Sequence, residues 1–123
     1  FERESTIKQT AELDRDRYGV VDIWVEQEPG SGGKDSAKAT IRNLAGFVVR
    51  ADRPTGDKAI RARPLAAQAE AGNVLLVRGA WNTVYLDELV GFPNGKYKDQ
   101  VDASSGALSK LAGGSQASMT KAL

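Results

Sequence analysis

Short apolar runs alternate along this chain with segments that have helical periodicity. Residues 20–27 begin as an apolar run that predicts a buried strand, and this strand turns acidic at Glu26 and Glu28. A turn rich in glycine follows. Apolar residues then recur at the i, i+4, i+7, i+8 spacing of a core-facing helix, which Asp35 or Ser36 could cap. Residues 47–49 predict a second strand, so we expect a strand–helix–strand unit with parallel strands.

The same alternation continues on both sides of this unit. It predicts a charged helix over 5–17, a helix from Pro64 to Glu70, a third buried strand over 74–77, and helices over 82–90 and from Asp99 onward. Residues 50–63, between two of these elements, predict a basic loop. Residues 113–123 are small and polar, which predicts a flexible tail behind one domain over 1–112.

The composition limits which catalytic groups and metal ligands the chain can use, and it says less about the fold. The 123 residues include no cysteine and no histidine, which excludes disulfides, thiolate metal sites and catalysis by imidazole. Metal chemistry would have to use Asp and Glu, whose hard oxygens favour Mg²⁺ or Mn²⁺. The chain has no apolar run near the ~20 residues that span a bilayer, and its start does not resemble a signal peptide. We therefore expect a cytoplasmic protein without membrane contact.

The residues that could carry chemistry also have simpler explanations. Glu26 and Glu28 could be the solvated end of a strand, and Asp99 could be a charge that favours the start of a helix. The glycine turn fails the P-loop pattern because Glu28 and Asp35 stand where that pattern needs Gly and Ser or Thr. A tight turn explains it better. The aromatic residues Trp24, Trp81 and Tyr85 are expected in the core.

Four motifs point to a known family. They are EQEPGSGGK at 26–34, LAG at 44–46, GDKAIRARPLAAQAEAGNVLLVRGAW at 56–81 and FPNGKYKDQVDA at 92–103. In this order they resemble the C-terminal nuclease domain of the phage terminase large subunit, over about residues 6–111. The resemblance implies an α/β, RNase H-like three-layer fold with a short, mostly parallel sheet flanked by helices. It also implies metal-dependent endonucleolytic cleavage of double-stranded DNA with two Mg²⁺ or Mn²⁺ ions.

The resemblance assigns roles to particular residues. The second acidic position of the family falls on Glu26 or Glu28, and Glu26 is the first choice because it lies nearer the apolar run; the third falls on Asp99. Glu26 and Asp99 are therefore the expected catalytic metal ligands. Glu28 and Asp102 are expected as alternative ligands or as groups that support them. The cations expected to contact DNA phosphates are Lys34, Lys58, Arg61 and Arg63.

Two departures from the family pattern affect this expectation. The first acidic strand and its hairpin would precede Phe1, which suggests a fragment or a truncated prophage remnant with an incomplete metal site. Lys98 stands where many relatives have an acidic residue. The alternative is therefore a catalytically inactive fragment that binds DNA or partner subunits.

The resemblance also implies partners. These are double-stranded DNA and, in the full protein, a terminase small subunit and a portal, within a bacterial host cell. The strand over 20–27 would present an unpaired edge if its neighbour is missing, and such an edge predicts self-association.

Overall fold

The chain forms an α/β structure in two compact units. The computed structural model describes the backbone of residues 2–122 and the side chains of residues 2–113. The units are Phe1–Thr55 and Gly56–Leu123. A two-stranded parallel sheet with flanking helices confirms the predicted α/β class.

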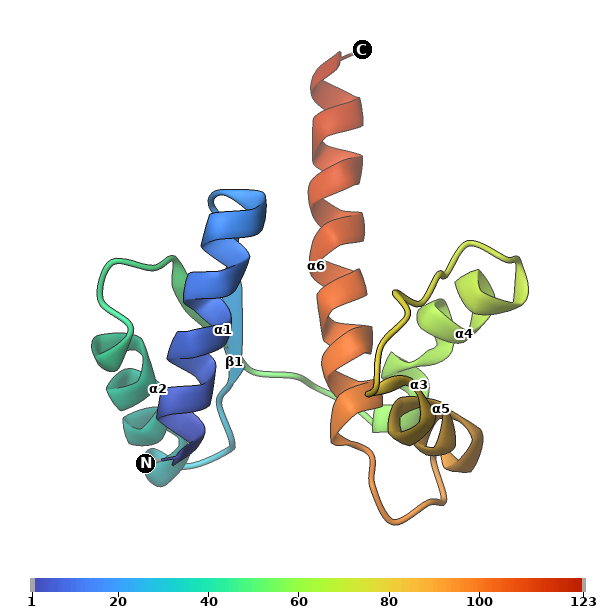
Figure 1. Cartoon of the computed structure of the whole chain (residues 1–123), viewed down its shortest axis with the longest axis horizontal. Coiled ribbons are helices and arrows are strands. Elements are labelled where there is room, and N and C mark those ends of the chain that lie inside the picture. Colours follow the sequence, from blue (N-terminus) through green and yellow to red (C-terminus); the bar gives the residue numbers. More distant parts are fainter. Residues whose placement is uncertain (1, 123) are drawn as a thin grey trace. The chain divides into compact units, whose positions relative to one another are not determined.

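The N-terminal unit contains the predicted strand–helix–strand arrangement (Figure 1). Helix α1 (Glu2–Tyr18) is followed by β1 (Ile23–Glu26), α2 (Ser31–Asn43) and β2 (Val49–Asp52). The two strands are parallel, and their register pairs Ile23 with Val49 and Glu26 with Asp52. Because α2 connects parallel strands, the carboxyl ends of both strands lie at the same edge of the sheet.

The core of this unit is small and lies along α2. Val25 of β1 is buried against a stripe of α2 that includes Ala37 and Thr40 and continues to Leu44, which is 2% exposed. Helix α1 is held partly by polar contacts. The Thr40 hydroxyl donates a hydrogen bond of 2.8 Å to Glu4, and the Arg15 guanidinium lies 4.1 Å from the centre of the Phe47 ring.

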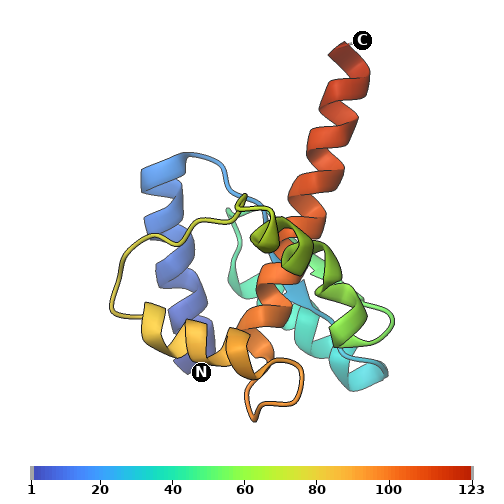
Figure 2. The same cartoon turned by 90° about the vertical axis from the view of Figure 1, so that its right-hand side faces the viewer.

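The C-terminal unit is helical within the part of the chain that the structure describes. Its elements are α3 (Lys58–Arg61), α4 (Arg63–Glu70), α5 (Asn82–Gly91) and α6 (Asp99–Ala122). Helices α3, α4 and α5 all contact α6, which forms the centre of the unit (Figure 2). Val101 and Ser105 of α6 are buried, and their i, i+4 spacing places them on one stripe of the helix.

The third strand predicted over 74–77 is wrong. This segment is an irregular connection in which Leu75 and Val77 are 89% and 75% exposed. A strand forms only where its backbone groups find a partner, and both described strands belong to the N-terminal unit. The side chains of residues 74–77 are apolar, but none of the described residues buries them.

Helix and strand boundaries also differ from the predictions. Helix α2 begins at Ser31 and includes Gly32 and Gly33, so neither Asp35 nor Ser36 caps it. Helix α1 begins at Glu2 rather than near Ser5, and Gly19 ends it with a φ of 80°. The tertiary contacts of these segments outweigh the low helix propensity of glycine.

Two of the three aromatic residues expected in the core are exposed. Trp24 is 38% and Trp81 is 58% exposed, so the prediction was wrong for both, whereas Tyr85 is half-buried. Trp24 lies on the face of β1 that alternates away from the buried Val25. Trp81 directly precedes α5 and follows the exposed segment 74–77 in the chain.

Two predicted irregular segments contain more helix or strand than expected. Residues 50–63, expected as a loop, contain the end of β2 and all of α3. The backbone of α6 continues through the segment expected as a flexible tail, as far as Ala122. The side chains of residues 114–123 lie outside the described part of the structure, and the flexibility of this segment stays a prediction. Among the described residues, no helix is long and apolar enough to cross a membrane.

Candidate functional site

Two acidic residues are paired in the register at the carboxyl end of the sheet. Glu26 is the last residue of β1, and its partner in the register is Asp52, the last residue of β2. Adjacent strands are about 4.8 Å apart, and paired residues of parallel strands point to the same face. The Gln27 amide donates a hydrogen bond of 2.7 Å to the Asp52 carbonyl, which extends the pairing one residue further. Both strands therefore end in an acidic residue at the same edge of the sheet.

Asp52 was missed by the sequence analysis. The second strand was predicted to end at residue 49, so Asp52 was assigned to the basic loop. An alternation of Val49, Arg50, Ala51 and Asp52 could have extended the strand, but the charges made this stretch resemble a loop.

The glycine turn that follows β1 is tight and brings α2 close to Glu28. Gly30 has a φ of 95°, which favours glycine, and a side chain at Gly33 would overlap the backbone carbonyl of Glu28. Glu28 is exposed beside this turn, and Lys34 is exposed in the first turn of α2. The structure therefore places Glu26, Glu28 and Lys34 within one short segment.

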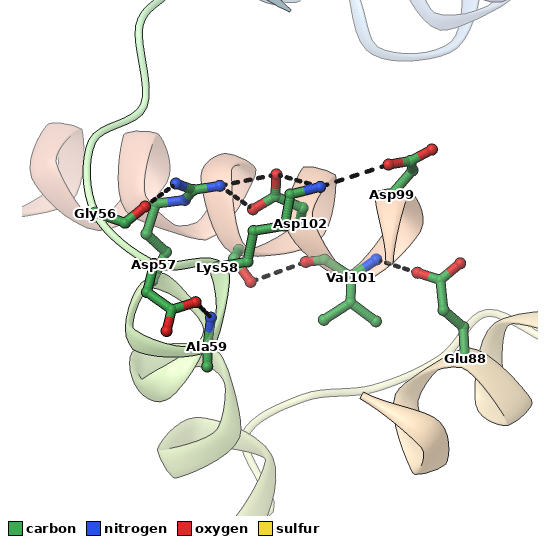
Figure 3. A network of polar contacts seen from close by, with 10 residues as sticks. Gly56, Asp57, Lys58, Ala59, Glu88, Asp99, Val101 and Asp102 are labelled. Atoms are coloured by element: carbon green, nitrogen blue, oxygen red, sulfur yellow. Dashed lines mark hydrogen bonds and ion pairs between the residues drawn. The ribbon is translucent and has the colours of Figure 1, made fainter. Parts of the chain in front are cut away.

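The other predicted acidic residues lie at the start of α6 and differ sharply in environment. The Asp99 side chain is 99% exposed and the Asp102 side chain 12% exposed. Arg61 donates from one nitrogen to both carboxylate oxygens of Asp102, at 2.9 and 3.0 Å (Figure 3). Its second terminal nitrogen donates to the Gly56 carbonyl at 2.7 Å. These contacts fix α3 against α6.

Lys58 connects the two aspartates. Its ammonium nitrogen lies 3.6 Å from an Asp99 oxygen and 3.7 Å from an Asp102 oxygen (Figure 3). Asp57 caps α3 by accepting a hydrogen bond of 3.1 Å from the Ala59 amide, which orients the first turn that carries Lys58. Two of the four cations expected to contact DNA are thus engaged with carboxylates.

Glu88 is a buried carboxylate that the sequence analysis did not identify. It is 8% exposed, and it accepts a hydrogen bond of 2.6 Å from the Val101 amide (Figure 3). The Gln100 side chain donates a second hydrogen bond to it, at 3.3 Å. A carboxylate at this end of a helix satisfies an orphan amide and interacts favourably with the helix dipole. Glu88 belongs to α5, so only the packing of α5 on α6 reveals this capping role.

An open pocket of about 580 Å³ lies next to this cap. Its lining includes Glu88, Asp99, Gln100 and Tyr97, and the remaining lining residues are Val84, Asp87, Gly91, Gly95 and Lys96. Asp99 therefore lines this pocket as well as pairing with Lys58.

The predicted site residues are distributed over both units. Glu26, Glu28 and Lys34 belong to the N-terminal unit, whereas the other predicted site residues belong to the C-terminal unit. Arg63 begins α4 and is exposed. Within the described part of the chain, no three acidic side chains gather in a group that could hold a metal ion. The exposed carboxylates of Glu26 and Asp99 nevertheless have the oxygen donors that Mg²⁺ and Mn²⁺ prefer.

Comparison with known proteins identifies one family. Residues 2–111 match the family model described as the terminase RNaseH-like domain. No curated protein and no solved structure matches the chain significantly.

Proposed function

This chain belongs to the terminase RNase H-like domain family, and from that premise we propose that it is the nuclease domain of a DNA-packaging terminase. Its reaction would be metal-dependent endonucleolytic cleavage of double-stranded DNA. In the full protein a terminase small subunit and a portal would be its partners, in the cytoplasm of a phage-infected or prophage-carrying bacterium.

The observation that carries the proposal is the position of Glu26. It ends a strand of a parallel β–α–β unit, where the carboxyl ends of strands gather functional groups in open α/β sheets. Asp52 ends the neighbouring strand in register with it.

Carboxylates of this chain would bind the metal ions, and its cations would bind DNA. Glu26 and Asp99 would be the metal ligands, with Glu28, Asp52 and Asp102 as the carboxylates nearest to them in sequence or register. Divalent ions bound there would activate water and stabilise the leaving oxygen of the scissile phosphodiester.

The exposed cations Lys34 and Arg63 would contact backbone phosphates and so orient DNA without reading its bases. Such contacts make binding sensitive to salt, because each neutralised phosphate releases counterions. The salt dependence of DNA retention would therefore report on these two residues.

Plasmid nicking in the presence of Mn²⁺ tests the proposal. We expect the chain to convert supercoiled plasmid to nicked or linear forms, and we expect Glu26→Ala and Asp99→Ala to reduce the rate to the level of plasmid without protein. Glu70→Ala is the matched control, since Glu70 is an exposed carboxylate at the end of α4, and it should keep full activity.

Two results would contradict the proposal. Nicking that persists in both active-site variants would point to a contaminating nuclease or to other ligands. No nicking by the unmodified chain, together with salt-sensitive DNA retention, would favour the alternative of a catalytically inactive module that binds DNA or partner subunits.

A further inference from the structure

Helix α2 (Figure 1) carries three cations along one exposed side. Lys34, Lys38 and Arg42 follow one another at the i, i+4, i+8 spacing, which aligns their side chains along a helix. All three residues are exposed. The side of α2 that faces the core is a different one, where Ala37 and Thr40 are buried. The three cations therefore form a row on the solvent side of the helix, which we call the α2 stripe.

The cations of the α2 stripe form no ion pair within the described part of the chain. Asp35, the one acidic residue of α2, is exposed and pairs with none of the three. The helix therefore carries three cations against one carboxylate. Lys58 and Arg61 differ from them, because carboxylates of α6 already hold both. A row of exposed cations without internal partners is available to an external polyanion.

The α2 stripe is long enough to contact several phosphates. Four residues of helix rise by about 6 Å, so the first and last cations are about 12 Å apart along the helix axis. Each strand of duplex DNA carries one phosphate for about every 3.4 Å of its axis. We propose that the α2 stripe binds the phosphate backbone of duplex DNA, which adds Lys38 and Arg42 to the residues that contact it. This inference rests on the proposed function, from which it takes DNA as the ligand.

The α2 stripe begins at the acidic end of the sheet. A side chain at Gly33 would overlap the Glu28 carbonyl, so the first turn of α2 lies against the segment that follows β1. Lys34 belongs to this turn, and the other two cations lie one and two turns further along the helix. A duplex held by the stripe would therefore be anchored next to the strand end that carries Glu26.

DNA binding in the presence of a chelator tests the α2 stripe without metal or cleavage. The α2 variant combines Lys38→Ala with Arg42→Ala. We expect it to bind a duplex on the order of 10-fold more weakly than the unmodified chain at about 0.1 M salt, because two phosphate contacts are lost. The slope of log affinity against log salt concentration should become shallower by about 2. Fluorescence anisotropy of a labelled duplex measures both quantities.

Helix α1 provides a matched control. Lys8→Ala combined with Arg17→Ala also removes one exposed lysine and one exposed arginine from a helix of the same unit, so the net charge changes equally. We expect this control to keep the salt slope of the unmodified chain. Circular dichroism should be the same for all three proteins, since alanine has the highest helix propensity. Equal losses of affinity in both variants would indicate net charge alone and overturn the proposal, as would an unchanged salt slope in the α2 variant.

A second duplex of unrelated sequence separates phosphate contacts from base contacts. The α2 variant should lose the same factor of affinity for both duplexes, because phosphates carry no sequence information. A loss confined to one of the two sequences would overturn the assignment of the stripe to phosphates.

The two proposals fail in different ways. Plasmid nicking by the unmodified chain, together with unchanged DNA binding by the α2 variant, would overturn the role of the stripe and leave the nuclease function intact. DNA binding that the α2 variant weakens, without nicking by the unmodified chain, would overturn the nuclease function and leave the stripe intact. Absence of DNA binding by the unmodified chain would overturn both.

Discussion

At the scale of single residues, burial separates the acidic groups that stabilise this protein from those available for chemistry. Glu88 and Asp102 are largely buried, and their oxygens accept hydrogen bonds from the chain itself. Glu26 and Asp99 are exposed at the ends of a strand and a helix. The sequence presents all four as acidic residues, and only their surroundings divide them into these two groups.

Replacement of Glu88 tests the structural half of this division. Glu88→Ala removes the acceptor of the buried Val101 amide, and we expect it to lower the free energy of unfolding by about 1–3 kcal/mol, because the donor is left without a partner. Urea denaturation followed by circular dichroism measures this loss. Asp87→Ala, a change at the exposed neighbouring carboxylate, should change stability by less than about 0.5 kcal/mol. Equal effects would refute the capping role.

At the scale of elements, the glycine turn between β1 and α2 decides where the acidic edge of the sheet lies. Helix α2 begins inside the glycine run, and its second glycine packs on the Glu28 carbonyl. The sequence predicts the turn, but the predicted caps Asp35 and Ser36 lie several residues after the observed helix start at Ser31. Because the helix starts at Ser31, Lys34 lies in the first turn of α2 rather than in the turn before it.

Two neighbouring alanine substitutions test this packing. Gly33→Ala would place its methyl group against the Glu28 backbone, so we expect a loss of stability of about 1–3 kcal/mol from overpacking. A methyl group at Gly32 meets nothing within 4 Å, and Gly32→Ala should leave stability unchanged or raise it by up to about 1 kcal/mol. Thermal unfolding of both variants measures the difference. The same sign for both would count against the tight turn.

At the scale of the whole molecule, the chain presents apolar and strand-edge surface. The described residues form a sheet of only two strands, which has an outer edge on each strand. The segment 74–77 adds exposed apolar side chains in the C-terminal unit, and Leu75 is the most exposed of them. Surfaces of this kind favour association with another chain or segment.

We therefore expect concentration-dependent self-association. In sedimentation experiments the average mass should rise with protein concentration, and a strictly monomeric profile at high concentration would refute the expectation. Leu75→Lys combined with Val77→Lys distinguishes the two surfaces. Association that persists in this variant would assign it to the sheet edge, whereas its loss would assign it to the segment 74–77.

The sequence by itself determined the class of the fold, the parallel strand–helix–strand unit and the acidic residues available for metal chemistry. Periodicity and composition are local properties, and they were sufficient for these points. The absence of histidine and cysteine alone limited any metal site to carboxylates.

Only the tertiary structure decided which of these residues contact one another. It paired Asp52 with Glu26, joined Lys58 and Arg61 to Asp102, and made Glu88 the cap of α6. It also left the apolar segment 74–77 without a strand partner among the described residues. Such contacts join residues far apart in the chain. A local sequence pattern does not show which distant backbone group or charged side chain a residue will meet in the folded protein.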